Sequence, residues 1–127
     1  MSKLPALFIS HGAPDLPLRT GSTQDFLRQL SSSIPKPKAI LVVTAHWLTA
    51  WPTTSTATNP KTIYDFGGFS PELYRLNYPA PGDPKIAGRV ATVLNEAGFM
   101  AQANSSRGYD HGTWTPLLLI YPEAVFP

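Results

Sequence analysis

The stretch of residues 39–47 constrains the fold most strongly, because it is an apolar run that ends on a histidine. Six of the seven residues from Ala39 to Ala45 are apolar, and three of these six are β-branched. A continuous apolar run of this length, bounded by prolines, is typical of a strand that is covered on both faces. Parallel sheets bind their ligands just beyond the carboxyl ends of such strands. The run therefore predicts a parallel sheet with His46 at a functional edge.

A second apolar run, residues 4–10, also ends on a histidine, His11, and is followed by turn residues. Residues 22–30 between the two runs carry a helical apolar stripe, and we expect Ser22 to be the N-cap of this helix. A strand, a helix and a second strand joined by short loops form a βαβ unit, whose right-handed crossover makes the strands parallel. We therefore expect His11 and His46 at the same edge of the sheet.

The rest of the chain predicts an α/β fold, in which a mostly parallel central sheet built on this βαβ unit is flanked by helices. Threonine-rich residues 51–58 and the weakly alternating residues 99–103 are expected to be strands. Helical signals occur over residues 71–76, 84–97 and 115–121. The second of these helices has Asp83 and Pro84 at its start and Gly98 at its end.

Composition excludes several classes of function. The 127 residues suffice for one domain, and the ten basic residues, which leave a net charge of +2, form no stripe for nucleic acid. The absence of cysteine excludes disulfides and thiolate metal sites. No run approaches the roughly 20 apolar residues of a membrane span, and no secretory signal is evident. We therefore expect a soluble, cytoplasmic protein that binds neither nucleic acid nor membrane.

The chain has three histidines, His11, His46 and His111, and each lies next to an expected loop. Two neutral imidazoles from adjacent parallel strands suit Zn(II) or Fe(II), but two ligands are too few for a tight site. The glutamates available as a third ligand are Glu72, Glu96 and Glu123, and none is favoured by its position. The alternative for His11 and His46 is a pair of hydrogen-bonded turn histidines. His111 either stabilises its loop or acts as an acid or base beside Asp110.

Four aromatic residues, Tyr64, Phe66, Tyr78 and Trp114, can line a pocket, although each is also typical of a core or an interface. The sequence contains neither a nucleotide-binding glycine motif nor a serine nucleophile motif.

Five motifs, taken in order, resemble those of class III extradiol ring-cleavage dioxygenases, and in particular the branch of DOPA 4,5-dioxygenase-like proteins. The motifs are residues 11–14 (HGAP), 45–47 (AHW), 64–66 (YDF) with 68–71 (GFSP), 78–82 (YPAPG) and 107–114 (RGYDHGTW). Together they extend over nearly the whole chain.

The resemblance implies one mononuclear divalent metal, Fe(II) or Zn(II), and a catechol-type substrate whose ring is opened with O2 next to the diol. His11 and His46 match two metal ligands of the family, and His111 matches a catalytic pocket histidine. The residues that we predict to bind the substrate are Tyr64, Phe66, Asp110 and Trp114.

In the family, a third metal ligand and a further catalytic histidine lie in a C-terminal half, whereas this chain matches the N-terminal half. We therefore expect residues 1–127 to be the N-terminal portion of a single, incomplete catalytic domain. The apolar face that the missing strands would leave open favours self-association. One alternative is a non-catalytic metal-binding or interaction module, and a more distant one is a metal-dependent hydrolase on a similar sheet.

Overall fold

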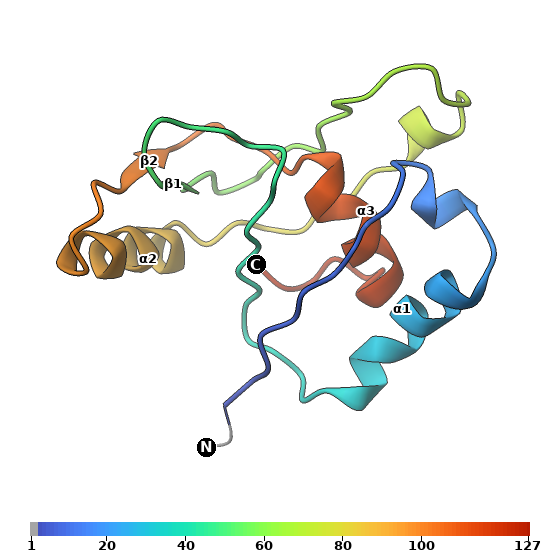
Figure 1. Ribbon diagram of the computed structural model, residues 1–127, viewed down its shortest axis with the longest axis horizontal. Coiled ribbons are helices and arrows are strands. Elements are labelled where there is room, and N and C mark those ends of the chain that lie inside the picture. The colour runs from blue at the N-terminus through green and yellow to red at the C-terminus, as the bar shows by residue number, and fades with distance from the viewer. Residues whose placement is uncertain (1–2) are drawn as a thin grey trace.

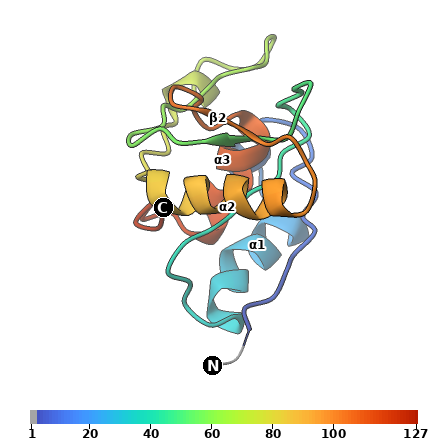
Figure 2. The same cartoon turned by 90° about the vertical axis from the view of Figure 1, so that its left-hand side faces the viewer.

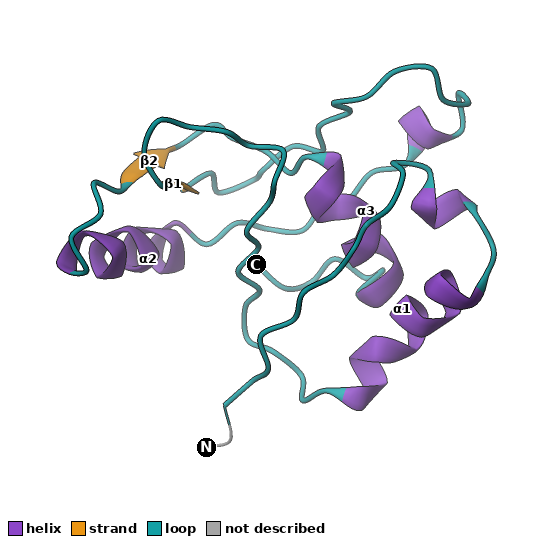
Figure 3. Ribbon diagram, in the orientation of Figure 1, coloured by secondary structure: helices purple, strands orange, loops and turns teal. Residues whose placement is uncertain are grey.

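Three α-helices and one parallel strand pair provide the regular structure of this computed structural model, which describes residues 3–127 (Figures 1 and 3). The elements in order are the 3-10 helix Leu16–Leu18, α1 (Ser22–Ser33), β1 (Thr53–Ser55), the 3-10 helix Leu73–Arg75, α2 (Pro84–Glu96), β2 (Gln102–Asn104) and α3 (His111–Ile120). Strands β1 and β2 pair in parallel, with Thr53 opposite Gln102. The predicted α/β class with a parallel sheet is confirmed. Strand β1 lies within the predicted segment 51–58, and β2 overlaps the predicted segment 99–103 but ends at Asn104.

The two apolar runs 4–10 and 39–47 are extended, but they are not the hydrogen-bonded strands that we predicted. A strand requires a neighbour that pairs with its backbone N–H and C=O groups. The described residues give the second run one such contact, from the Ile40 N–H to the Pro127 carbonyl oxygen at 2.7 Å. Both runs nevertheless lead in the same direction in Figure 1, and their carboxyl ends meet near the start of α3.

Helix α1 follows the first run and precedes the second in the sequence, as predicted, but its N-terminus differs from the prediction. Gly21 is the N-cap and makes no side-chain capping bond, and Ser22 is already the first helical residue. The backbone explains the shift, because the Gly21 carbonyl accepts the Asp25 N–H at 3.0 Å. The predicted helix over residues 71–76 is likewise reduced to a single 3-10 turn.

Helix α2 confirms its prediction, because its signals are local. The Asp83 carboxylate accepts hydrogen bonds from the backbone N–H groups of Lys85 and Ile86 at 2.9 and 3.0 Å. Gly98 follows the helix with a φ of +89°, a conformation that favours glycine. Figure 2 shows α2 crossing beneath the strand pair, and α2 contacts both β1 and β2.

Helix α3 is the centre of the packed part of the molecule, and it begins four residues earlier than we predicted. Asp110 is the N-cap, and its carboxylate accepts the Thr113 N–H. Pro116 therefore lies inside the helix. Two hydrophobic clusters flank α3, one with Leu16 and Leu27 and the other with Leu73 and Tyr78. The α3 residues in these clusters are Trp114, Leu119 and Ile120.

No helix in the described part of the chain has both the length and the apolar character that a membrane crossing requires.

Candidate metal centre

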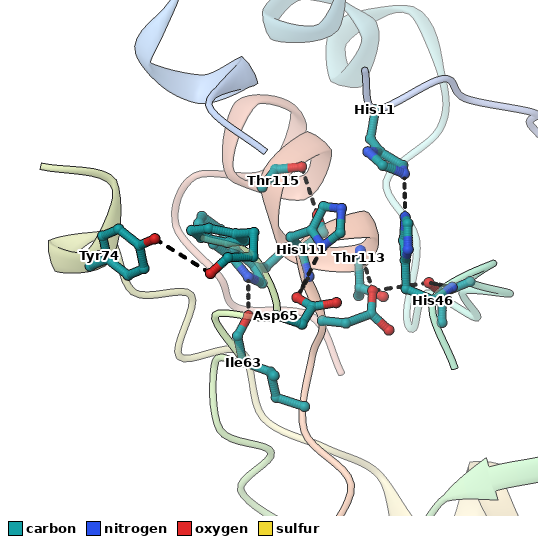
Figure 4. A network of polar contacts seen from close by, with 12 residues as sticks. His11, His46, Ile63, Asp65, Tyr74, His111, Thr113 and Thr115 are labelled. Atoms are coloured by element: carbon teal, nitrogen blue, oxygen red, sulfur yellow. Dashed lines mark hydrogen bonds and ion pairs between the residues drawn. The ribbon is translucent and has the colours of Figure 1, made fainter. Parts of the chain in front are cut away.

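The three histidines of the chain converge at one point, although they come from three separate segments (Figure 4). His11 and His46 follow the two apolar runs, and His111 is the first residue of α3. The Nε2 atoms of His11 and His46 lie 2.9 Å apart. One ring nitrogen from each of the three residues lies within 4.8 Å of the others. The predicted meeting of His11 and His46 is thus present in the structure, and His111, which the family resemblance places in the same pocket, lies next to them.

The donor set fits a borderline divalent metal. Imidazole is a good ligand for zinc and iron, and it must be neutral to bind. Burial lowers the pKa of His11, and the neighbouring His111 and His46 lower it further. His11 therefore stays neutral at a lower pH than a free histidine. Its Nδ1 atom is buried without a hydrogen-bond partner among the described residues, whereas its Nε2 atom faces His46. The cluster of potential ligands in the described chain contains no glutamate.

Asp65, and not Asp110, is the carboxylate next to His111. Its Oδ1 atom accepts the backbone N–H of His111 at 2.9 Å and lies 3.0 Å from the Nδ1 atom of the same residue. Burial by itself raises the pKa of Asp65, but the hydrogen bonds from the His111 backbone and side chain outweigh it, so that the pKa is lowered. Our sequence reasoning missed this role. The signal available was the position of Asp65 within the YDF motif.

Asp110 is 1% exposed, and both of its carboxylate oxygens are engaged within the protein. Oδ1 accepts the Thr44 hydroxyl at 2.9 Å and the Thr113 N–H at 3.2 Å. Oδ2 lies 3.2 Å from Arg107 Nη2. These contacts connect the segment before His46 to the start of α3. The role of Asp110 in binding a substrate stays a prediction.

The predicted aromatic residues lie beside His111 in two layers. The ring of Phe66 is 5.8 Å from the His111 ring and nearly perpendicular to it. Tyr64 and Trp114 lie behind Phe66, with ring centres at 6.3 Å from it in each case. The Tyr64 hydroxyl donates to the Leu76 carbonyl, and Trp114, which is fully buried, donates its indole N–H to the Ile63 carbonyl. Phe66 is thus the aromatic residue closest to the histidine cluster among these three, and their contact with a substrate stays a prediction.

The parallel strand pair and the histidine cluster define an α/β protein with a candidate metal site. Comparison with protein families identifies the family to which this protein belongs. Residues 5–127 match the family described as the catalytic LigB subunit of aromatic ring-opening dioxygenase. The chain belongs to this family.

Two curated relatives and one solved structure are similar to most of the chain. The chain is 44% identical to a 4,5-DOPA dioxygenase extradiol from Beta vulgaris, over 94% of this chain and 46% of the relative. It is 42% identical to the dioxygenase tasH of Hapsidospora irregularis, over 100% of this chain and 43% of the relative. A crystal structure of an uncharacterized Escherichia coli K12 protein is similar with a TM-score of 0.64 and 31% identity, over 84% of this chain and 38% of that chain. The chain therefore spans less than half the length of the relatives it matches.

Proposed function

We propose that this chain provides the metal-binding part of an extradiol dioxygenase that opens the ring of a catechol-type substrate with O2. The observation that carries the proposal is the convergence of His11, His46 and His111 in a chain of the LigB family. Because relatives carry the name 4,5-DOPA dioxygenase extradiol, DOPA is the first catechol to test.

We assign His11 and His46 as metal ligands through their Nε2 atoms. These two atoms lie 2.9 Å apart and face each other. Imidazole nitrogens of this kind would suit either Fe(II) or Zn(II). When bound, the ion supplies Lewis acidity and brings the diol and O2 together.

His111 is the proposed catalytic residue. Asp65 faces Nδ1 of His111 at 3.0 Å, so that Nε2 is the ring nitrogen left for the reactants. An imidazole held in this way can accept a proton from a catechol hydroxyl and return it to the product. The perpendicular ring of Phe66 forms an apolar wall beside it, and we propose that this wall contacts the aromatic ring of the substrate.

The reaction inserts both atoms of O2 into the product, and the ring bond next to the diol breaks. No external reductant is required, because the catechol supplies the electrons. The expected stoichiometry is therefore one O2 consumed for each catechol opened.

The test is O2 uptake by a full-length form that joins these 127 residues to a C-terminal half of the kind the family has, loaded anaerobically with Fe(II) and then given DOPA and air. We expect uptake together with a yellow absorbance from the ring-opened product, and loss of both in His46→Ala. The control variant is Gln29→Ala, on the exposed face of α1, which should retain turnover. Equal turnover in His46→Ala would contradict the proposal. Stoichiometric zinc without any turnover would favour a non-catalytic metal-binding module instead.

The self-association predicted from the sequence also belongs to this proposal. Phe8, Val43 and Leu48 are 101%, 93% and 90% exposed, and all three lie in or next to the two apolar runs. Exposed apolar side chains gathered on unpaired backbone favour association between copies. We retain the cytoplasmic location as a proposal, which the lack of cysteine supports.

A further inference from the structure

We propose that the first turn of α3 positions His46 for metal binding, through contacts made by Thr44, Asp110 and Gly112. The inference rests on the proposed function in one respect, which is that His46 is a ligand. Figure 4 shows the region, in which the His46 segment lies against the start of α3. These three would be positioning residues, since they contact a ligand residue and not the metal or the substrate.

The first contact is a relay of two hydrogen bonds. The backbone N–H of His46 donates to the Thr44 hydroxyl at 3.2 Å, and that hydroxyl donates to Asp110 Oδ1 at 2.9 Å. Because the hydroxyl has one proton, its bond to the carboxylate leaves a lone pair facing the His46 N–H. Asp110 is itself held by the Thr113 N–H and by Arg107. The backbone of His46 is thereby fixed to the N-cap of α3.

The second contact is steric and lies next to the proposed ligand atom. A Cβ atom on Gly112 would be 2.7 Å from His46 Cδ2, 3.1 Å from Thr44 Oγ1 and 3.2 Å from Asp110 Oδ1. Cδ2 is bonded directly to Nε2 in the imidazole ring, so a displacement of Cδ2 also moves Nε2. The absence of a side chain at position 112 thus allows the ring to approach the helix.

A third contact restrains the residue that follows His46. The Arg107 guanidinium lies 5.2 Å from the centre of the Trp47 ring and also pairs with Asp110 Oδ2 at 3.2 Å. Residues 107–112 therefore contact the His46 segment at positions 44, 46 and 47.

These contacts add to those that the His46 ring makes with the imidazoles of His11 and His111 inside the cluster itself. His46 is exposed, and the run before it has no strand ladder. The helix that carries His111 as its first residue also fixes His46, so one element sets the positions of both imidazoles relative to each other. Groups of this kind, which orient a ligand, typically change metal affinity by about 10- to 100-fold when they are removed.

The test compares two pairs of variants in the 127-residue chain. Gly112→Ala adds the Cβ that would meet His46, and its control Gly88→Ala adds one inside α2, where no atom lies within 4 Å. Thr44→Val removes the hydroxyl of the relay, and Thr44→Ser keeps it. Thr92→Val is the control, since the Thr92 hydroxyl donates only to its own helix. The readouts are the affinity for Co(II), the visible spectrum of bound Co(II), and the nuclear Overhauser effect between His46 Hδ2 and Gly112 Hα in the metal-free protein.

We expect at least about a tenfold loss of Co(II) affinity and an altered spectrum in Gly112→Ala and Thr44→Val, with recovery in Thr44→Ser and no change in either control. The wild-type protein should show the His46–Gly112 Overhauser effect without metal. If both Thr44→Val and Gly112→Ala keep the wild-type affinity and spectrum, the inference is overturned but the metal site stands. Absence of the Overhauser effect in the wild-type protein would overturn the inference in the same way. Failure of the wild-type chain to bind Co(II) would overturn the proposed function and this inference together. If Gly112→Ala does not fold, the Thr44 series decides alone.

Discussion

Helix α3 and the two apolar runs at residues 4–10 and 39–47 all carry large apolar side chains, but they lie in opposite environments. Within α3, Trp114 and Thr115 are fully buried, and Leu119 and Ile120 are 7% and 4% exposed. In the runs, Phe8 and Val43 are 101% and 93% exposed. The backbone N–H and C=O groups of α3 form hydrogen bonds within the helix. Its side chains pack against α1 on one side and against the segment around Leu73 on the other. The runs need neighbouring strands, and the described residues provide almost none.

The candidate site lies where a packed region, α3 and its neighbours, meets an open region, the two apolar runs. His111 belongs to α3, and His11 and His46 end the two runs. The geometry of the site therefore depends on contacts between the regions, such as the bond from Thr44 to Asp110. The packed region should be sensitive to loss of side-chain volume or to a buried charge, and the open region should respond mainly through association.

The largest effect is expected from Trp114→Ala. Trp114 is fully buried, and its indole N–H donates to the Ile63 carbonyl at 2.9 Å. Its truncation should lower the free energy of unfolding by about 3–5 kcal/mol, measured by urea denaturation. Trp51→Ala, at a side chain that is 45% exposed, is the control and should cost less than about 1 kcal/mol. Equal losses would show that α3 is not the packed centre.

An intermediate effect is expected at alkaline pH. Burial raises the pKa of Tyr78 to about 12, whereas the unfolded chain ionises near 10. In the folded state, the Tyr78 hydroxyl therefore keeps its proton to a higher pH than in the unfolded state. The free energy of unfolding is unaffected below pH 10 and falls as the pH rises from 10 to 12. The loss should approach about 2–3 kcal/mol at the upper end.

Thermal unfolding measured across this pH range tests the prediction. Tyr78→Phe should show a smaller alkaline loss, although it also removes the hydrogen bond to the Tyr121 carbonyl and lowers stability at neutral pH. Tyr74→Phe, at a side chain that is 37% exposed, should keep the wild-type slope. The prediction fails if Tyr78→Phe and the wild type lose stability equally between pH 10 and 12.

The smallest change in stability is expected in the open region. The double variant Phe8→Ser with Val43→Thr should alter the free energy of unfolding by no more than about 0.5 kcal/mol, because both side chains are almost fully exposed. Sedimentation velocity should instead show less association at high concentration. Phe99→Ser, 55% exposed and located after α2, is the control that should associate like the wild type. A large loss of stability in the double variant would mean that the runs are packed.

Local signals in the sequence predicted local structure well. Helix α2 has both ends marked by nearby residues, Asp83 and Gly98. The start of α3 was misplaced because Thr115 and Pro116 resemble a helix start, whereas Asp110 is the stronger cap. The strands expected at residues 4–10 and 39–47 depend on partners distant in the sequence, and no local pattern reports whether such partners exist.

The candidate site was likewise predictable only in part. The βαβ pattern correctly predicted that His11 and His46 lie close together, although the two runs do not form paired strands. The contacts of Asp65 with His111 and of Thr44 with Asp110 join residues that are 46 and 66 positions apart. Their formation depends on the paths of two long loops, for which the sequence contains no periodic signal.

The central claim is that His11 and His46, which end the two apolar runs, bind one metal ion, and X-ray absorption spectroscopy tests it most directly. We predict that the chain, loaded with one equivalent of Zn(II), shows nitrogen ligands at about 2.0–2.1 Å with imidazole scattering. The imidazole contribution should fall in both His11→Ala and His46→Ala. Absence of imidazole scattering in the wild type, or scattering unchanged in both variants, would contradict the account.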